Sequence, residues 1–177
     1  MIDGIPPSEE GVQLGGRIMV VIASSLYFQS GIRDFTLDMA RNLTGLNDQW
    51  AHRFQTIVDE MCNNAIEHGS KPGDEIALTF HLKPGEYLEV VVEDQGTGEK
   101  KLTASELAAL VEAKKHTSPV DIHSLRGRGL ARIVSRWTDE LEFTDRKPSG
   151  IRARARKYFR NITGSRTTLL STLSHSP

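Results

Sequence analysis

The segment from Asn47 to Gly69 has the most regular pattern in the 177-residue chain. Its apolar residues recur at three- and four-residue intervals, which places them on one stripe of an α-helix. These residues are Trp50, Phe54, Ile57, Val58, Met61 and Ala65. Asn47 is a favourable N-cap, and Gly69 directly after His68 is typical of a helix end. The pattern predicts an amphipathic helix whose stripe must be covered by other elements.

The segments around this helix predict a sheet. Two runs, 76–82 and 88–92, alternate apolar and polar residues on either side of a short Pro-Gly loop, as antiparallel strands do. Further strands are expected over 17–24, 140–143 and 150–158, and further helices over 30–43, 102–113 and 130–137. The order predicts an α+β two-layer sandwich, with a mostly antiparallel sheet and helices on one face.

The length fits one domain. Residues 1–16 contain prolines and glycines without periodicity and are interpreted as a flexible arm, residues 17–158 as the domain, and residues 159–177 as a tail rich in Ser and Thr.

Charge and composition exclude several classes of protein. Lys and Arg number 22 against 23 Asp and Glu, a net charge of -1, which gives no overall attraction to nucleic acid or to an anionic membrane. No apolar run is long enough to span a bilayer. The single cysteine, Cys62, cannot form an internal disulfide and is interpreted as a plain buried thiol. We expect a soluble cytoplasmic protein.

Three polar residues of the long helix form a ridge beside its apolar stripe. Glu60, Asn64 and His68 are spaced by four, and each such step turns a helix by only about 40°. Polar groups at the border of a core need a partner or a ligand. One alternative is that they only satisfy neighbouring backbone groups, and His68 has the further alternative of complementing the dipole at the helix end.

A strand ends in an unusual way at Asp94. The sequence Asp94-Gln95-Gly96-Thr97-Gly98 places a carboxylate before two glycines, so that a flat ring could approach the backbone while the acid accepts a hydrogen bond from an exocyclic amine. Taken alone, the pattern is also compatible with an ordinary turn.

A second glycine pair lies directly before a predicted helix, in Arg126-Gly127-Arg128-Gly129-Leu130. Backbone N–H groups at a helix start bind anions, and arginines add charge and bidentate hydrogen bonding to phosphate. A mobile hinge is the alternative. The common P-loop and dinucleotide-binding patterns are both absent from the chain.

Together, Glu60-x-x-x-Asn64-x-x-x-His68, Asp94-x-Gly96-x-Gly98 and Gly127-x-Gly129-Leu130 resemble the N, G1 and G2 boxes of the Bergerat-fold ATPases, the histidine-kinase-like superfamily. The resemblance covers about residues 17–157. The short stretch before Asn64 and the brief segment between the last two boxes are similar to the bacterial anti-sigma-factor serine/threonine kinases.

The resemblance implies a role for each box. Asp94 would receive the adenine amino group of ATP, and Gly96 and Gly98 would give the base room. Asn64 would be a ligand of Mg²⁺, and Glu60 would be the general base for a serine or threonine hydroxyl of a protein substrate.

In the third box, Arg126, Arg128 and the N–H groups around Gly127, Gly129 and Leu130 would stabilise the transferring phosphate.

The family also implies partners. Its members phosphorylate a small anti-anti-sigma (STAS-type) protein and sequester a sigma factor, and a homodimer is expected. One departure is Gly150-Ile151, where the family has Gly-Thr and where Ser149 is the nearest hydroxyl. It leaves open an alternative, a nucleotide-binding partner-switching module without kinase activity. DNA binding through Arg152, Arg154 and Arg156 is a third and weaker hypothesis.

Overall fold

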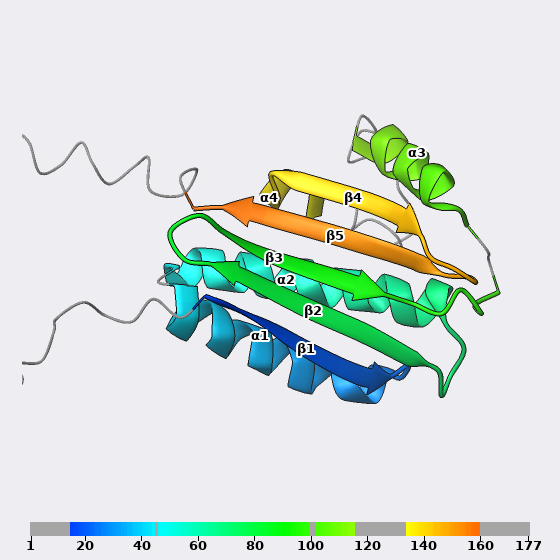
Figure 1. Cartoon of the computed structure of the whole chain (residues 1–177), viewed down its shortest axis with the longest axis horizontal. Helices are drawn as coiled ribbons and strands as arrows, with labels where there is room; N and C mark the ends of the chain where they lie inside the picture. Colours follow the sequence, from blue (N-terminus) through cyan, green and yellow to red (C-terminus); the bar gives the residue numbers. More distant parts are fainter. Residues whose placement is uncertain (1–14, 45, 100–101, 116–133, 160–177) are drawn as a thin grey trace, which may run out of the picture.

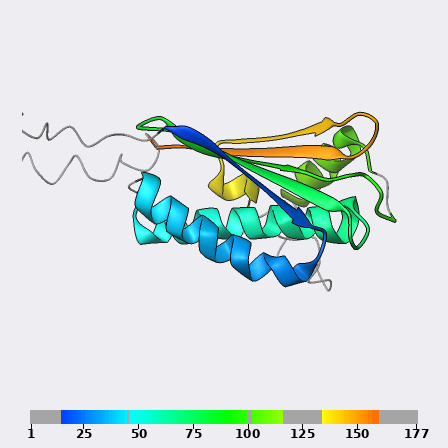
Figure 2. The same ribbon diagram turned by 60° about the horizontal axis from the view of Figure 1, so that its bottom comes forward.

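A computed structural model of the chain describes residues 15–44, 46–99, 102–115 and 134–159. Within these residues one sheet has the strand order β1-β2-β3-β5-β4, and every neighbouring pair is antiparallel. The strands are β1 (Gly16–Ala23), β2 (Glu75–Lys83), β3 (Tyr87–Glu93), β4 (Glu140–Asp145) and β5 (Ile151–Tyr158). Helices α1 (Gln29–Thr44) and α2 (Asp48–Asn64) pack on one face of the sheet (Figure 1 and Figure 2). The predicted α+β two-layer sandwich is confirmed.

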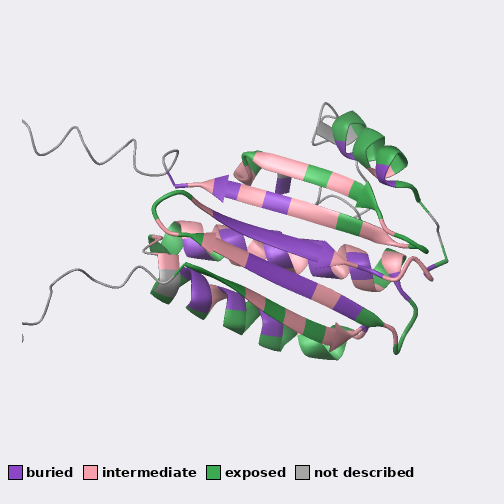
Figure 3. Ribbon diagram, viewed as in Figure 1, coloured by how far each residue is buried: buried purple, intermediate pink, exposed green. Residues whose placement is uncertain are grey.

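The strand register explains which face of the sheet is apolar. Residues that are direct cross-strand neighbours form continuous rows, because alternate side chains of each strand point to the same face. The two central rows are Ile18–Phe80–Val90–Ala155–Leu141 and Val20–Leu78–Val92–Ala153–Phe143. Five of these residues, those of β2 and β3 and Ala155, belong to the buried core, and the other five are partly buried and pack against it. Figure 3 shows this burial along β2, β3 and the inner sides of α1 and α2.

Helix α2 forms as its sequence predicts. The Asn47 side chain accepts a hydrogen bond from the Trp50 N–H at 2.9 Å, which caps the first turn. The stripe is buried, with Ile57 1% and Val58 0% exposed. Cys62 lies within it, and burial, followed by the nearby Asp59 carboxylate, raises the pKa of this thiol to about 12. The interpretation of Cys62 as a plain buried thiol is confirmed.

The shorter elements lie around the sheet and the long helices. They are η1 (Leu26–Phe28), η2 (Ala65–Gly69), α3 (Ala104–Lys115) and α4 (Ser135–Trp137). The turn η2 is π-helical and continues α2 directly, so the predicted single helix to Gly69 changes its winding after Asn64. Of the helix expected over 130–137, the structure describes residues 134–137.

The face of the sheet away from the helices carries a network of charges. Glu89 is 6% exposed and pairs with Arg154 at 2.9 Å and with Arg156 at 2.7 Å. Both arginines also reach Glu140 from β4, and Arg154 reaches Glu142. Arg156 and Glu89 are cross-strand neighbours, as are Arg156 and Glu140, so the register itself builds this network.

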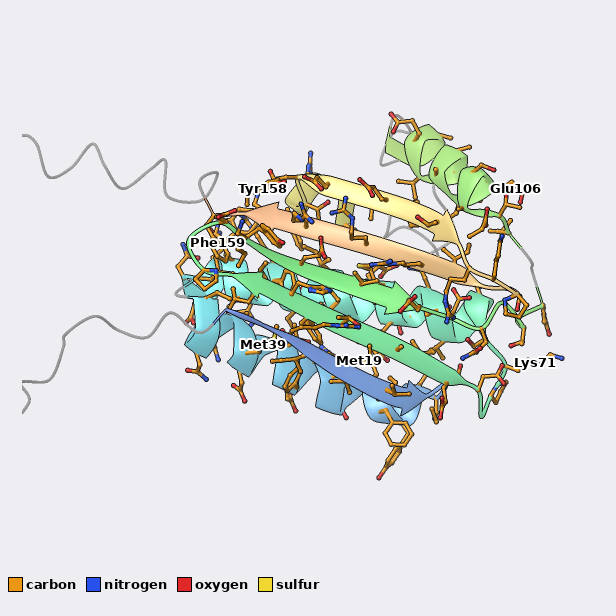
Figure 4. All side chains as sticks on the ribbon, viewed as in Figure 1. Met19, Met39, Lys71, Glu106, Tyr158 and Phe159 are labelled. Atoms are coloured by element: carbon orange, nitrogen blue, oxygen red, sulfur yellow. The ribbon has the colours of Figure 1, made fainter. Side chains whose placement is uncertain are left out.

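The chain enters and leaves the sheet at the end where Phe159 lies (Figure 4). The Phe159 N–H donates to Glu86 O at 2.9 Å, and the ring is buried in the core. The opposite end, where β3 ends and α3 begins, carries Lys71 and Glu106 in the same view. Over the described ranges, the helices are too short and too polar to cross a bilayer.

Candidate functional site

A cavity of about 310 Å³ lies at the end of the sheet where β3 and β4 end and β5 begins. Its walls come from the end of α2 with η2, the end of β3, the start of α3 and the hairpin between β4 and β5. Apolar side chains line its floor: Met61, Ala65, Val92, Leu107, Ile151 and Ala153. Polar and charged side chains also line it: Asn64, His68, Asp94, Thr103, Asp145 and Arg146. An apolar cavity with a few converging polar groups is typical of a small-molecule site.

Asp94 is held rigidly at the end of β3. Its side chain is buried, with the residue 8% exposed, and Oδ1 accepts hydrogen bonds from the Gly96 N–H at 2.9 Å and the Ile151 N–H at 3.1 Å. Burial raises the pKa of this carboxyl above its ordinary value, while the Ile151 and Gly96 N–H groups and the nearby Arg146 lower it. Oδ1 is therefore satisfied by the backbone. Within the described residues Oδ2 accepts no hydrogen bond, and it is available to a ligand in the cavity.

The two predicted glycines of this loop are required by close packing. Gly96 has φ +64°, and a Cβ there would lie 2.2 Å from the Gly150 N atom. A Cβ on Gly98 would lie 2.0 Å from His68 O. The Thr97 and Gly98 N–H groups both donate to Gly69 O, at 3.1 and 3.4 Å. The loop thus docks onto the end of the helix and satisfies one of its last carbonyl groups.

The predicted ridge of α2 ends beside this loop. The Asn64 Nδ2 atom donates to Glu60 O at 2.6 Å and lies 3.4 Å from Glu60 Oε1. The amide is therefore tied back to its own helix through nitrogen, and its oxygen Oδ1 accepts nothing from the described residues. Both residues are half-buried, whereas His68 is exposed. The prediction that the ridge lies at the border of the core is confirmed for Glu60 and Asn64, whereas it is wrong for His68.

The predicted site residues do not all line the cavity. Four of those that the structure describes line it: Asn64, His68, Asp94 and Gly96. Glu60 and Gly98 do not line it, but Glu60 contacts Asn64 and Gly98 contacts His68. Residues Arg126, Gly127, Arg128, Gly129 and Leu130 lie outside the described residues. The structure therefore joins two of the three predicted motifs in one place.

Two glycines that sequence reasoning did not assign to the site lie against Asp94. A Cβ on Gly69 would lie 2.4 Å from Asp94 Oδ2. Gly150 has φ +102°, and a Cβ there would lie 2.3 Å from Asp94 O. Gly69 was visible in the sequence only as a helix end, and Gly150 as a strand start and as the glycine before Ile151, where the family has Gly-Thr. No sequence signal connects either glycine with Asp94, because the contacts depend on how three separate segments pack.

The hairpin between β4 and β5 forms a further wall, of which the sequence indicated only the stretch from Ser149 to Ile151. The Ser149 Oγ atom donates to Gln95 O at 2.6 Å, and the Arg146 N–H donates to Gly150 O at 2.8 Å. The Arg146 side chain reaches across to Asp94 O and Glu93. Ile151, where the family has threonine, contributes its N–H to Asp94 and its side chain to the cavity.

The start of α3 closes the cavity from the β4 edge. Thr103 and Glu106 cap each other: the Thr103 N–H donates to Glu106 Oε2 at 2.8 Å, and the Glu106 N–H donates to Thr103 Oγ1 at 3.2 Å. The Ala104 N–H donates to Asp145 Oδ1 at 2.7 Å, which fixes the helix to the end of β4. The same Thr103 and Asp145 line the cavity.

A family model for the histidine kinase-like ATPase domain matches residues 27–157, most of the chain and all of the elements that build the cavity. The chain belongs to this family. No curated protein matches it. Family membership makes the chain an ATP-binding domain of the histidine kinase-like type, and the fold agrees, since Asp94 and the ridge of α2 meet at one cavity.

Proposed function

We propose that the chain is an ATP-dependent serine/threonine-protein kinase that acts as an anti-sigma factor. In this proposal it phosphorylates an anti-anti-sigma (STAS-type) protein and sequesters a sigma factor. The observation that carries the ATP-using part is the meeting of Asn64 and Asp94 in one cavity, with a single carboxylate oxygen available to a ligand. The partners rest on the resemblance of the three motifs to the anti-sigma kinases.

The cavity suits a purine base. Its volume of about 310 Å³ is at the lower end of the range for small-molecule sites, and its floor is largely apolar. Asp94 Oδ2 would accept a hydrogen bond from the exocyclic amine of adenine, which requires the ionised carboxylate. The apolar floor from Val92 and Ile151 would cover the faces of the ring.

The Asn64 side chain fits a magnesium ligand. Its nitrogen is engaged with Glu60 O, so that its oxygen is the atom that remains for a cation. Mg²⁺ binds oxygen, keeps several waters and shares phosphate oxygens, so one protein ligand is sufficient. When bound, the ion would neutralise charge on the transferring phosphate. Elsewhere in the described residues no cluster of three or more His, Cys, Asp or Glu side chains could hold a metal.

Glu60 is the proposed general base. It lies one helical turn before Asn64, and the 3.4 Å contact between Oε1 and the Asn64 amide orients its carboxylate toward the magnesium ligand. From there it would accept the proton of the substrate hydroxyl as phosphoryl transfer begins. Arg126 and Arg128, with the N–H groups around Gly127 and Gly129, would hold the phosphates.

The test compares three variants in ATP binding and in phosphoryl transfer to the anti-anti-sigma partner. Glu60→Gln should lower transfer by about 10² or more while ATP binding persists. Asp94→Asn should abolish ATP binding. Glu67→Gln, a change at an exposed residue of η2, is the matched control and should leave both unchanged. Transfer that survives Glu60→Gln would rule out the general base.

The partner-switching module without kinase activity remains the second candidate, favoured by Ile151. At this position no side-chain hydroxyl is available to the site, and the nearest one, on Ser149, donates to Gln95 O. Under this alternative ATP would still bind, no phosphoserine would form with a verified partner, and exchange of partners would be insensitive to Glu60→Gln.

A further inference from the structure

We propose that Arg146 is a positioning residue for nucleotide recognition, acting through Asp94 from the hairpin between β4 and β5. The inference rests on the proposed role of Asp94 as the acceptor for the adenine amine. It adds a residue that lies in none of the three motifs and is separated from Asp94 by 52 positions in the sequence.

Three contacts fix Arg146 in place. Its N–H donates to Gly150 O at 2.8 Å, which closes the hairpin. Its Nη1 donates to Asp94 O, and its Nε lies 3.3 Å from Glu93 Oε1. The side chain is 30% exposed and lines the cavity. A guanidinium that is bound through both Nη1 and Nε has little conformational freedom. Its charge is therefore fixed beside the end of β3.

This geometry matters because Asp94 is buried. Burial raises the pKa of its carboxyl, and the two backbone N–H groups of Ile151 and Gly96 together with Arg146 oppose that effect. The backbone donors belong to the fold and are present in any variant that folds. Among the groups that lower the pKa of Asp94, Arg146 is the one that acts through a side chain.

Other ionisable groups surround Asp94 as well. Glu93 precedes it on the same strand, Asp145 approaches from the hairpin, and His68 lies across the cavity on η2. Glu93 and Asp145 carry carboxylates, and His68 carries an imidazole. Among the described side chains that line the cavity, Arg146 is the permanently charged cation.

The ionisation state of Asp94 decides whether the amine of adenine can be recognised. With Oδ1 already accepting two N–H groups, protonation would place the hydrogen on Oδ2. Oδ2 would then be a donor facing a donor, and the hydrogen bond to the amine would be lost. Removal of Arg146 raises the pKa of Asp94, so that this loss begins at a higher pH.

The experiment measures the Kd for ATP with Mg²⁺ from mildly acidic to mildly alkaline pH in the wild type and in Arg146→Met. The ratio of the two Kd values is then plotted against pH, because protonation of the ATP phosphates cancels in the ratio. We expect the ratio to rise by about threefold or more from alkaline to acidic pH, because Asp94 takes up its proton at a higher pH when the charge of Arg146 is absent.

Two further variants separate charge from shape. Arg146→Lys keeps the cation and should give a nearly flat ratio. Arg152→Met removes an exposed arginine of β5 that lies directly opposite Glu93 in the register, and it should also give a flat ratio near one. Thermal unfolding of each variant checks that the fold is retained.

The outcomes are distinct. A Kd ratio for Arg146→Met that is raised equally at every pH would mean that the residue only supports the hairpin, and would overturn the inference while leaving ATP binding intact. A ratio of one throughout would also overturn it. A wild type that does not bind ATP at any pH would refute the proposed function itself.

Discussion

At the scale of single residues, the site depends on the space between Gly69 and Asp94. The last residue of η2 has no side chain, and this allows the Asp94 carboxylate to lie directly against its Cα. A Cβ at this position would lie 2.4 Å from both Cγ and Oδ2 of Asp94, and Oδ2 is the oxygen proposed to contact the base.

Gly69→Ala should therefore lower the affinity for ATP by about tenfold or more. Overpacking of this kind costs about 1–3 kcal/mol, and it would displace Asp94 Oδ2, the oxygen proposed to accept the adenine amine. Gly31→Ala is the control. A Cβ on this glycine of α1 meets nothing within 4 Å, so the change should raise the free energy of unfolding by up to about 1 kcal/mol and leave ATP binding unchanged. Titration calorimetry and thermal unfolding measure both. Equal ATP affinity in the two variants would contradict the predicted contact.

At Ile151 the absence of a side-chain hydroxyl bears on ATP binding. Its backbone N–H donates a hydrogen bond to Asp94 Oδ1, which any residue at this position could do. The difference from the family pattern therefore lies in the side chain. Ile151→Thr adds a hydroxyl to the cavity and should tighten ATP binding by about two- to tenfold, the effect of one additional hydrogen bond. Ile151→Val has nearly the same shape as threonine without the hydroxyl. The prediction is wrong if the Thr and Val variants bind ATP equally.

At the scale of elements, the loop after Asp94 and the turn after η2 are tied together. Asp74 Oδ2 accepts hydrogen bonds from the Thr97 hydroxyl and from the Lys71 N–H, the latter at 3.0 Å. The Lys71 N–H also reaches Thr97 Oγ1 at 3.0 Å. The Gln95 N–H donates to Ser70 Oγ at 3.3 Å. These contacts hold the helix end that follows Asn64 against the strand end that carries Asp94.

Thr97→Val should remove this connection while keeping the shape, and it should lower the melting temperature at neutral pH. The Thr97 hydroxyl, followed by the Lys71 N–H, lowers the pKa of Asp74 below its ordinary value. A carboxyl with a lowered folded-state pKa stabilises the fold above its unfolded-state pKa, and this stabilisation is lost as the pH falls through the lower value. The difference in melting temperature between wild type and variant should thus shrink on acidification. Thr97→Ser keeps the hydroxyl and should show no such difference at any pH.

At the scale of the whole molecule, the two faces of the sheet have different roles. One face forms the core with α1 and α2, and the other carries the network of Glu89, Arg154, Arg156, Glu140 and Glu142. Arg154 and Arg156 are therefore engaged with carboxylates. This pairing counts against DNA binding through Arg154 and Arg156, since their charge is already neutralised.

Glu89 is the centre of that network and the best place to test it. Glu89→Gln removes the most buried carboxylate shared by the two guanidinium groups, which then keep only the more exposed Glu140 and Glu142, and it should lower the free energy of unfolding by about 3 kcal/mol. Glu142→Gln changes a carboxylate that also pairs with Arg154 but is 61% exposed, and it should cost less than about 1 kcal/mol. Urea denaturation of both variants gives the comparison. Similar losses would show that burial does not set the strength of these pairs.

Much of this architecture follows from local pattern in the sequence. The apolar stripe of α2, its Asn47 cap and the two strands β2 and β3 were all predicted correctly. The position of Glu60 and Asn64 at the border of the core was also predicted correctly, because the winding of a helix fixes which residues share a face. The order of the motifs also indicated the family that the model for residues 27–157 shows.

What only the tertiary structure decided are the contacts between segments that are distant in the chain. Gly69, Arg146 and Gly150 all lie against Asp94, yet Gly69 ends η2 while Arg146 and Gly150 belong to the hairpin between β4 and β5, and none has a pattern of its own. The change to a π-helical turn after Asn64 was equally invisible. The physical reason is that periodicity records which face a residue occupies, whereas the fit of a glycine or the position of a guanidinium depends on how loops from three elements pack together.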